Sequence, residues 1–345
     1  MLPYLPMNDP VEVVITLKFL EGLIKPLVEL SPRLHIQVIH ARETSDIPTE
    51  IWERVEVLYT TRVIPTPEEA PRLKWIQFHW AGADHAVQAP ILAKPGVQAT
   101  TLSGASVTQM AEHALMMLLA LGHHLPEAGA LQKRAEWPLD RWERFSPKEL
   151  CGSTVGIIGY GSVGREIARL LSGFGATILA TKRDAMHPAD TGYLPKGLGD
   201  PNGDLVQRLY PPQALRSMLK ECDFVVVCAP LTSETHNWLD AEALAACKPG
   251  AYLVSLSRGG IVDENALIPL LREQKIGGAA LDVFSSEPLP ADSPLWKLPN
   301  VIITPHVAGF SPHYDQRAVV LFAENLQRYL SGLPLHNRIN IEKEY

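Results

Sequence analysis

The chain has 345 residues, of which 46% are hydrophobic and 20% charged, and its formal net charge is -7. A chain of this length exceeds the usual size of one hydrophobic core, so we expect two domains. The acidic balance argues against nucleic acid as a partner, because neutralising phosphates needs a concentrated basic surface.

No segment predicts a membrane span, a secretion signal or a metal site. The most apolar run, residues 114–121, is far shorter than the roughly 20 residues that a membrane-spanning helix needs. The acidic N-terminal segment has no basic stretch leading into an apolar one, so we expect a cytoplasmic protein. The cysteines lack the paired spacing of metal ligands and are expected to be reduced, mostly buried thiols: Cys151, Cys222, Cys228 and Cys247.

Short apolar runs rich in β-branched residues predict buried strands from the start of the chain. The first series covers residues 12–17, 35–40, 55–60 and 75–80, with helical stretches between them. Such alternation predicts a parallel sheet with crossover helices. A long helical pattern follows at residues 107–123, and then a polar arm at residues 136–148, rich in tryptophan and charge. We place the domain boundary at that helix.

The alternation of strands and helices restarts at Thr154. It predicts six strands, over residues 154–158, 177–181, 224–228, 252–256, 278–281 and 301–303. Six parallel strands make a complete dinucleotide-binding sheet. A last helix, at about residues 313–330, follows the sixth strand and is expected to return to the first domain.

A glycine-rich turn joins the first strand of this second series to a helix. The motif Gly159-Tyr160-Gly161-Ser162-Val163-Gly164 follows the strand and opens the helical pattern, which is the context that a dinucleotide-binding loop requires. Gly159 makes the tight turn, Gly161 lets the backbone approach a pyrophosphate, and Gly164 permits close helix packing. The diphosphate then lies at the helix N-terminus, where free N–H groups favour negative charge.

These patterns predict an α/β protein with two doubly wound parallel-sheet domains. Residues 106–309 are expected to form a Rossmann dinucleotide-binding domain. A flavodoxin-like substrate domain is expected to combine residues 1–105 and 310–345.

The end of the second strand predicts which dinucleotide is bound. An NAD-preferring site normally has a carboxylate there for the ribose 2'-hydroxyl. This chain has Lys182 and Arg183, two cations able to neutralise a 2'-phosphate, so we favour NADP(H) over NAD(H). The alternative is a solvated cationic pair, with Asp184 contacting the hydroxyl.

A long segment after this strand, residues 185–212, is crowded with proline and glycine and shows no clear periodicity. Such length usually marks function or disorder. It should lie near the adenosine end of a bound dinucleotide, where it could act as a flap. A surface insertion without a function is the alternative.

Three later segments hold candidate catalytic residues, each after a predicted strand: Ser257-Arg258-Gly259-Gly260-Ile261-Val262-Asp263-Glu264, Asp282-Val283-Phe284-Ser285-Ser286-Glu287-Pro288-Leu289 and Thr304-Pro305-His306-Val307-Ala308-Gly309. In order and spacing they resemble the D-isomer-specific 2-hydroxyacid dehydrogenases. The resemblance extends over residues 150–309 and more loosely through the N-terminal domain.

This resemblance implies a catalytic triad of Arg258, Glu287 and His306. Oxidising a 2-hydroxy acid requires a base that removes the hydroxyl proton as hydride leaves the same carbon, and His306 matches that base. Glu287 matches the carboxylate that orients the ring and stabilises its protonated form. Arg258 matches the guanidinium that holds the substrate carboxylate and polarises the 2-oxo group.

The resemblance also implies further binding residues. Besides the glycine loop, Lys182 and Arg183, the cofactor is expected to meet Thr108, Cys228, Ala229, Pro230, Thr235, Leu256, Ser257, Arg258, Asp282, His306 and Gly309. With Arg258 and His306, a substrate loop at Trp80, Ala81 and Gly82 is expected to hold the substrate. The alternative for this loop is a tight strand-to-helix turn.

Members of this family usually dimerise through the helix and arm that correspond to residues 110–148. A homodimer is therefore expected, with Trp137 or Trp142 either reaching the neighbouring active site or anchoring the arm.

The resemblance does not identify the substrate, because glyoxylate and hydroxypyruvate reductases, D-lactate-type enzymes, phosphoglycerate dehydrogenases and formate dehydrogenases share this scaffold. The chain ends soon after the last helix, so we expect no appended regulatory domain of the kind found in many phosphoglycerate dehydrogenases. Formate dehydrogenases resemble the pattern but carry glutamine where Glu287 stands. The Lys182-Arg183 pair favours a reductase of glyoxylate or hydroxypyruvate. A non-catalytic, dinucleotide-sensing scaffold, like the corepressors similar to this family, is the alternative function.

Overall fold

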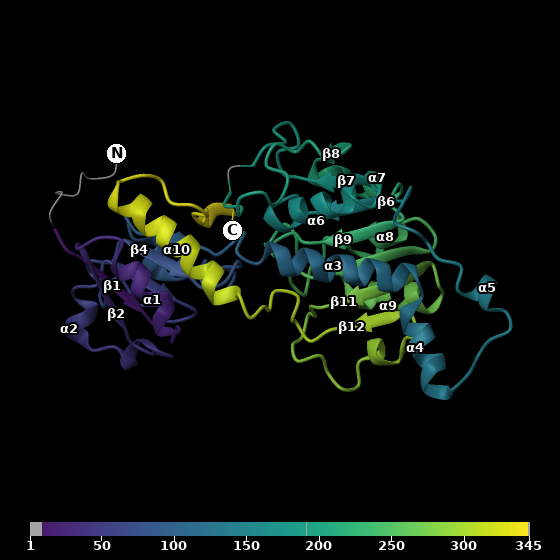
Figure 1. Ribbon diagram of the computed structural model, residues 1–345, viewed down its shortest axis with the longest axis horizontal. Helices are drawn as coiled ribbons and strands as arrows, with labels where there is room; N and C mark the ends of the chain where they lie inside the picture. Colours follow the sequence, from purple (N-terminus) through teal and green to yellow (C-terminus); the bar gives the residue numbers. More distant parts are fainter. Residues whose placement is uncertain (1–8, 191, 344–345) are drawn as a thin grey trace. The chain divides into compact units, whose positions relative to one another are not determined.

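The computed structural model describes residues 9–190 and 192–343, which divide into two compact units (Figure 1). The first unit combines the segment up to Ser106 with the segment from Ser311, and the second unit spans Val107–Phe310. Within the described residues, none of the helices has the length and apolar character needed to cross a membrane.

The first unit is built on a five-stranded parallel sheet. Its strands are β1 (Val11–Ile15), β2 (Leu34–Val38), β3 (Val57–Thr60), β4 (Trp75–Phe78) and β5 (Gln98–Thr100). Their order, β2-β1-β3-β4-β5, is that of flavodoxin-like folds. The helices are α1 (Glu21–Val28), α2 (Thr49–Trp52), α10 (Tyr314–Leu330) and the 3-10 turns η1 (Thr44–Asp46), η2 (Pro90–Ala93) and η5 (Ile341–Lys343).

Helix α10 belongs to this first unit although it comes last in the chain. Figure 1 shows it beside α1, and the two helices contact each other. Its apolar side buries Val319, Phe322 and Leu326 in the same core as Val13 and Trp75. An amphipathic pattern at the end of the chain therefore completes the core of a sheet formed at its beginning.

The second unit contains a seven-stranded sheet, and all of its strands are parallel. They are β6 (Thr154–Ile158), β7 (Thr177–Thr181), β8 (Arg208–Tyr210), β9 (Phe224–Val227), β10 (Ala251–Ser255), β11 (Ile276–Leu281) and β12 (Val301–Ile303). The order is β12-β11-β10-β9-β6-β7-β8, so six of the strands follow the doubly wound dinucleotide-binding arrangement and β12 extends it.

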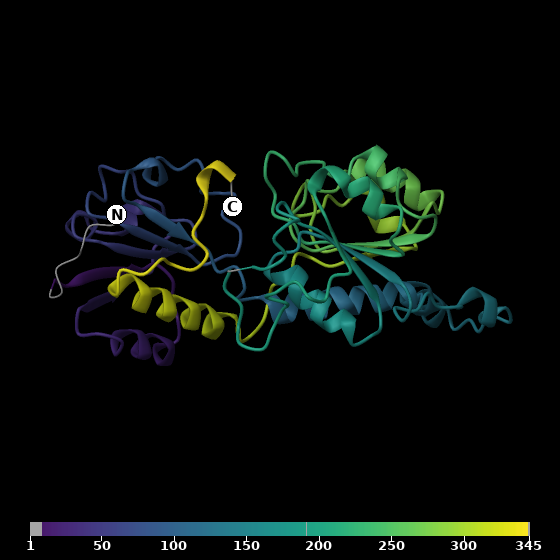
Figure 2. The ribbon, with the colours of Figure 1, turned by 90° about the horizontal axis from the view of Figure 1, so that it is seen from above.

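Helices cover both faces of this sheet, as Figure 2 shows. One face packs against α3 (Val107–Gly122) and α6 (Ser162–Ser172), and the other against α7 (Leu215–Leu219), α8 (Ala241–Ala245) and α9 (Glu264–Arg272). The remaining helical elements are α4 (Leu125–Arg134), α5 (Arg141–Arg144), η3 (Pro212–Ala214) and η4 (Pro294–Lys297). Coverage of both faces explains the uninterrupted apolar run of β9, which is buried along its whole length.

The α/β class with two parallel-sheet domains is confirmed, but two strands differ from the sequence prediction. The second sheet has seven strands where six were expected, because β8 lies inside residues 185–212, the segment expected to lack regular structure. Strand β5 was also missed. Both have three residues and include polar ones, so neither shows the apolar run that marks β12, a strand of the same length.

Candidate active site

The glycine loop has the close packing that its sequence predicts. Gly159 has a φ of +98°, and a Cβ atom there would lie 2.6 Å from the Cα of Ala229. A Cβ on Gly164 would overlap the Gly159 carbonyl oxygen, whereas one on Gly161 would meet nothing within 4 Å. Glycine is therefore required at two positions by contact within the protein, while Gly161 leaves open space where a diphosphate fits. Ser162 and Val163 lie with Gly164 in the first turn of α6.

The loop after β9 lies against this glycine loop. The thiol of Cys228 donates to the Gly159 carbonyl over 3.6 Å, and burial raises the pKa of Cys228 to about 12, so the thiol stays protonated. The hydroxyl of Thr235 donates to the Pro230 carbonyl over 2.7 Å. Four of the expected cofactor residues, Cys228 to Pro230 and Thr235, thus form one folded loop beside the glycine turn.

The cations after β7 are engaged with their surroundings. The Lys182 ammonium donates to the carbonyl oxygens of His187 and Ala189, and burial, followed by the charge of Arg165, lowers its pKa. Arg183 forms an ion pair of 2.8 Å with the exposed Glu234. Asp184, the alternative ligand for a ribose hydroxyl, accepts hydrogen bonds from the His187 ring and from a backbone N–H in its own turn.

His306 and Glu287 form a hydrogen-bonded pair. The His306 Nδ1 lies 2.7 Å from the Glu287 Oε2, and both side chains are more than a third exposed. The other carboxylate oxygen accepts the Phe284 N–H over 3.0 Å, which fixes the carboxylate plane. This contact at Nδ1 leaves His306 Nε2 without a partner among the described residues, so that nitrogen can exchange a proton with a bound substrate.

The loop carrying His306 is held by Asp282, which is buried at the end of β11. Its carboxylate accepts the Thr304 hydroxyl at 2.6 Å and the Val307 and Ala308 N–H groups, each at 2.9 Å. His306 itself has a φ of +52°, a left-handed conformation that few residues other than glycine adopt. Three hydrogen bonds to one buried carboxylate thus fix a strained backbone at the candidate proton donor.

Helix α3 contributes two contacts to this loop. His113 Nε2 lies 3.3 Å from the Thr304 hydroxyl, and the Gln109 side chain donates to the Gly309 carbonyl over 2.9 Å. His113 is also 3.9 Å from Asp282, but burial outweighs that charge and lowers the pKa of His113, so the contact is with a neutral imidazole. The expected cofactor residue Thr108 lies in the first turn of this helix.

The Arg258 loop, after β10, packs directly on the loop that carries Glu287. A Cβ on Gly259 would overlap the carbonyl of Phe284, so this position admits only glycine. Arg258 donates to the Ser257 carbonyl over 2.9 Å. Leu256 is buried beside it, and the Ser257 hydroxyl is buried without a hydrogen-bond partner among the described residues.

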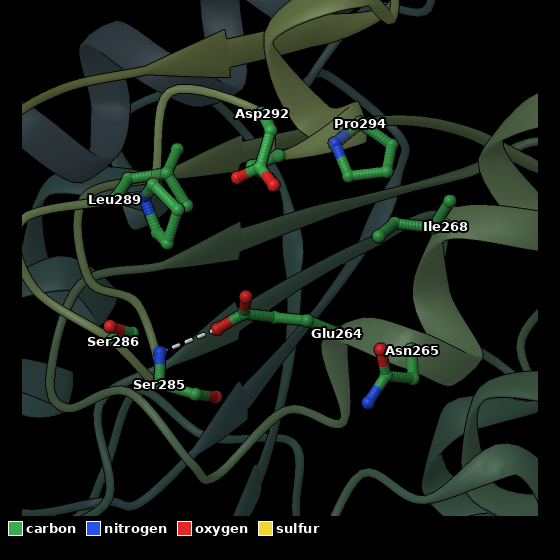
Figure 3. Close-up of a pocket in the computed structure, with 10 residues that line it drawn as sticks. Glu264, Asn265, Ile268, Ser285, Ser286, Leu289, Asp292 and Pro294 are labelled. Carbon is green, nitrogen blue, oxygen red and sulfur yellow. Dashed lines mark hydrogen bonds between the residues drawn. The ribbon is translucent and has the colours of Figure 1, made fainter.

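A second contact joins the same two loops. Glu264, at the first position of α9, accepts the Ser285 N–H over 2.6 Å (Figure 3). Figure 3 also shows the pocket behind this contact, lined by residues of α9 and by residues on both sides of Glu287 in the following loop. The two loops that present Arg258 and Glu287 are therefore fixed to each other within the second unit.

The structure thus brings all three predicted catalytic residues into one unit, with the glycine loop. Sequence reasoning missed the supporting residues Thr304, His113 and Glu264. Glu264 had a recognisable signal, since it follows a helix-capping aspartate at the end of the Arg258 segment. Thr304 opens the His306 segment, but its hydrogen bond to Asp282 depends on the loop conformation. His113 contacts Thr304 from α3, in a distant part of the chain, and had no signal.

The expected substrate loop, at Trp80, Ala81 and Gly82, follows β4 in the first unit. Trp80 is 45% exposed. The residue before it, His79, is buried and lies 2.8 Å from the Tyr59 hydroxyl, and burial lowers the pKa of His79 to about 4. The Tyr314 hydroxyl donates to the His79 carbonyl over 2.7 Å. A neutral histidine therefore anchors the start of this loop.

Comparison with known proteins identifies the family. Residues 115–308 match the family model described as the NAD binding domain of the D-isomer specific 2-hydroxyacid dehydrogenases. The glyoxylate reductase of Thermofilum pendens is 34% identical over 267 residues, which cover 77% of this chain and 74% of that protein. The D-3-phosphoglycerate dehydrogenase of Methanocaldococcus jannaschii is 34% identical over 79% of this chain but only 49% of its own length. The chain therefore spans about half the length of the phosphoglycerate dehydrogenases that it matches.

Solved structures resemble the whole chain. A D-isomer specific 2-hydroxyacid dehydrogenase from Xanthobacter autotrophicus Py2, in complex with NADPH and MES, has a TM-score of 0.79 at 28% identity and covers 98% of this chain and 100% of its own. An NADPH-dependent glyoxylate/hydroxypyruvate reductase from Sinorhizobium meliloti, in complex with NADP and sulfate, has a TM-score of 0.75 at 26% identity, over 97% and 100% of the two chains. The family resemblance predicted from the sequence is confirmed.

Proposed function

Because the chain belongs to the D-isomer specific 2-hydroxyacid dehydrogenase family, we propose that it is an NADPH-preferring reductase of small 2-oxo acids, of the glyoxylate or hydroxypyruvate class. The observation that carries this proposal is the hydrogen bond of 2.7 Å between His306 and Glu287 in the unit that also holds a complete glycine loop. A redox cofactor site and an acid–base pair are the two parts that such a reduction needs.

The residues divide the chemistry as follows. The nicotinamide, when bound, supplies the hydride to the carbonyl carbon. His306 donates the proton from Nε2 to the carbonyl oxygen, and Glu287 orients the ring at Nδ1 and favours its protonated form. Arg258 binds the substrate carboxylate and polarises the 2-oxo group. Hydride and proton together convert the carbonyl to a hydroxyl, and the reverse reaction uses His306 as the base.

The cofactor preference rests on the charges after β7. The strand is followed directly by the two cations Lys182 and Arg183, and the next carboxylate, Asp184, already accepts hydrogen bonds from His187 and from a backbone N–H in its own turn. An ammonium has three N–H donors, and Lys182 uses two on backbone carbonyls, which leaves one for a phosphate. Arg183 forms an ion pair with Glu234 at the exposed surface, and exposed ion pairs exchange partners at little cost. The Xanthobacter and Sinorhizobium proteins, described with NADPH and NADP, support the same preference.

The remaining assignments follow the family. Residues 106–309 form the cofactor domain, and residues 1–105 with 310–345 form the substrate domain, whose N–H groups at Trp80, Ala81 and Gly82 hold the substrate carboxylate. Residues 110–148 form the interface of a homodimer. Trp137, Leu139 and Trp142 support this assignment, because they are 80%, 91% and 79% exposed, unusual for large apolar side chains on one short arm.

A cofactor-resolved substrate screen tests the proposal. Glyoxylate, hydroxypyruvate and pyruvate are each offered with NADPH and with NADH, and kcat/KM is measured for every pair. We expect turnover of at least one oxo acid, with kcat/KM about tenfold or more higher for NADPH, a difference of about 1.4 kcal/mol. A tenfold advantage for NADH contradicts the cofactor preference. Absence of turnover with all six pairs contradicts the enzymatic function and favours a dinucleotide-sensing scaffold.

A further inference from the structure

The segment between β7 and α7 consists mostly of turns before it reaches β8, but it packs closely on itself. Gly197, Gly199 and Gly203 all have left-handed φ angles, between +70° and +82°. Cβ atoms on Gly199 and Gly203 would lie 2.8 Å from Leu194 and 2.7 Å from Pro188, so the chain folds closely on itself at both glycines. We call residues 185–212, apart from Thr191, the insertion.

A buried arginine joins the insertion to the glycine-loop helix. Arg165, in the first turns of α6, is 0% exposed. Its guanidinium donates to the carbonyl oxygens of Asp200 and Pro188, the latter over 2.6 Å, and lies 3.3 Å from the Asp190 carboxylate. These three partners all belong to the insertion. A buried guanidinium is costly unless it is paired and hydrogen-bonded, so Arg165 is stable in this position only while the insertion is docked.

Two further side chains strengthen the same contact. Tyr160, between the first two glycines of the loop, stacks on Arg165 at 4.5 Å and donates its hydroxyl to the Asp200 carboxylate over 2.5 Å. Glu166, buried beside Arg165, accepts the Gly199 N–H over 2.6 Å. Tyr160, the residue between the first two glycines of the loop, therefore also holds the insertion in place through a hydrogen bond.

The other end of the attachment lies at the end of β7. Lys182, the residue after that strand, donates to the carbonyls of His187 and Ala189. The insertion is thus fastened to the glycine loop through Tyr160 and Arg165 and to the strand end through Lys182. Dinucleotides bind between these two segments in sheets of this order.

We propose that the insertion is a docked structural part of the cofactor site, and that Arg165, Tyr160 and Lys182 are positioning residues through which it sets the affinity for the adenosine half of the dinucleotide. The inference rests on the proposed function only in taking the cofactor to be NAD(P). By bonding to both segments, the insertion fixes the distance between the glycine turn and the strand end before the cofactor arrives. When the two segments are ordered before the cofactor binds, the binding free energy does not include the entropy cost of ordering them. The affinity for the cofactor is therefore higher without any added contact.

Binding measurements without substrate test this proposal. The dissociation constants of NADP+, NAD+ and 2',5'-ADP are measured by calorimetry for wild type, Arg165→Met, and Arg272→Met, an exposed arginine of α9 that serves as the control. Limited proteolysis reports whether the insertion has opened. We expect Arg165→Met to expose the insertion to cleavage and to weaken all three ligands about tenfold or more, and Arg272→Met to do neither.

If Arg165→Met does not fold, two milder variants test whether the insertion sets the affinity for the dinucleotide. Tyr160→Phe keeps the ring stacked on Arg165 and removes only the bond to Asp200, so we expect a loss of about threefold to fivefold for each ligand. Lys182→Met should weaken NAD+ as well as NADP+, although NAD+ has no 2'-phosphate. Loss of NADP+ binding alone would assign Lys182 to the phosphate and overturn its positioning role.

One outcome overturns the proposal as a whole: an insertion that becomes labile to protease while every dissociation constant stays at its wild-type value. The insertion would then be a surface element without a role in binding. These measurements use no oxo acid, so a protein that binds dinucleotides but reduces none of the offered substrates contradicts the proposed function and leaves the inference standing.

Discussion

Two histidines follow strands of the two sheets, and each has a carboxylate near its ring. His306 lies 2.7 Å from Glu287, with 43% of its side chain exposed. His79 lies 3.6 Å from Asp315 with 5% of its side chain exposed, and its other ring nitrogen bonds to Tyr59. Burial lowers the pKa of His79 to about 4 and raises that of Asp315, so His79 is a neutral imidazole near pH 7 and the contact is not an ion pair.

Solvent access, and not residue type, separates the proposed proton donor from the structural histidine. His306 keeps one ring nitrogen for exchange and has its orientation fixed by a carboxylate. His79 is enclosed by Phe19, Tyr59, Trp80 and Tyr314, whose rings lie within 6 Å of it. The first arrangement suits catalysis and the second suits packing under a loop.

The largest expected effect separates these two roles directly. Replacing His306 with Asn should lower kcat by about 100- to 10,000-fold, because general acid–base catalysis contributes that much. The matched substitution His79→Asn should leave kcat within about tenfold of wild type, since His79 transfers no proton in the proposed reaction. Steady-state rates of both variants, with circular dichroism to confirm folding, decide between them. Equal losses in the two variants contradict the assignment of His306.

A second test concerns the substrate carboxylate. Lysine at position 258 keeps the charge but not the planar pair of donors, so Arg258→Lys should raise the KM for the oxo acid and lower kcat together. Loss of one charge-assisted hydrogen bond predicts a drop in kcat/KM of roughly 10- to 100-fold. The control is Arg272→Lys, on the exposed side of α9. Unchanged kinetics for Arg258→Lys would place the carboxylate elsewhere.

A third test addresses the charge beside His306. In Glu287→Gln the amide still contacts Nδ1 but no longer favours the imidazolium. As pH rises, the rate of reduction should therefore fall at a lower pH than in wild type. Oxidation needs the neutral ring, so its rise with pH should move in the same direction. Rate profiles of both reactions between pH 5 and pH 9 measure the shift, and superimposable profiles for variant and wild type exclude the role given to Glu287.

A fourth and smaller effect is expected at Glu264, which holds the Ser285 N–H but contacts no predicted ligand. Glu264→Met removes the acceptor, and the loss of one hydrogen bond should lower kcat about fivefold through a displaced Glu287. Glu264→Gln retains an acceptor oxygen and should restore most of that activity. Because a displaced Glu287 also alters proton transfer, the pH profile of Glu264→Met should shift towards that of Glu287→Gln. A lowered rate with the wild-type profile would mean a purely structural role.

The sequence predicted the sheets from local apolar patterns, and it predicted the catalytic triad from the motifs that carry the family resemblance. Strands β10 and β11 are apolar runs of five and six residues, and β12 is an apolar run of three; Arg258, Glu287 and His306 follow these strands in turn. The carboxyl ends of parallel strands meet at one edge of a sheet. Residues that follow these strands are therefore expected at that edge for any conformation of the loops. The glycine loop is equally local, since its strand, turn and helix are consecutive.

The supporting contacts could not be predicted, because they depend on loop conformation. Asp282 bonds to Thr304 and to two N–H groups of the His306 loop, and no spacing in the sequence encodes that pairing. The docking of the insertion on Arg165 joins residues 23 to 35 positions apart across a segment with no periodicity. His79 had the same local signal as His306, a histidine after a strand, and only burial distinguishes the two.

The smallest expected effect on turnover is at His79, where the prediction concerns stability. An unfolded histidine titrates near pH 6.5, and the folded pKa of His79 is about 4, so the unfolded chain binds the proton more readily between these values. The free energy of unfolding should therefore decrease as pH falls from about 6.5 to about 4, by at most about 3 kcal/mol from this group. Asp315 acts in the opposite direction, because its raised pKa favours the folded state on acidification.

The variant His79→Gln isolates the histidine contribution. Glutamine does not titrate and can accept the Tyr59 hydroxyl, while Asp315 is present in both proteins and cancels from their difference to first order. Urea unfolding of wild type and variant at pH 7 and at pH 4.5 gives that difference. Wild type should lose more stability than the variant on acidification, and kcat of the two proteins at pH 7 should agree within a few-fold. An equal loss in both would mean that His79 is protonated in the folded protein, and the contrast between the two histidines would then rest on the shorter His306–Glu287 distance alone.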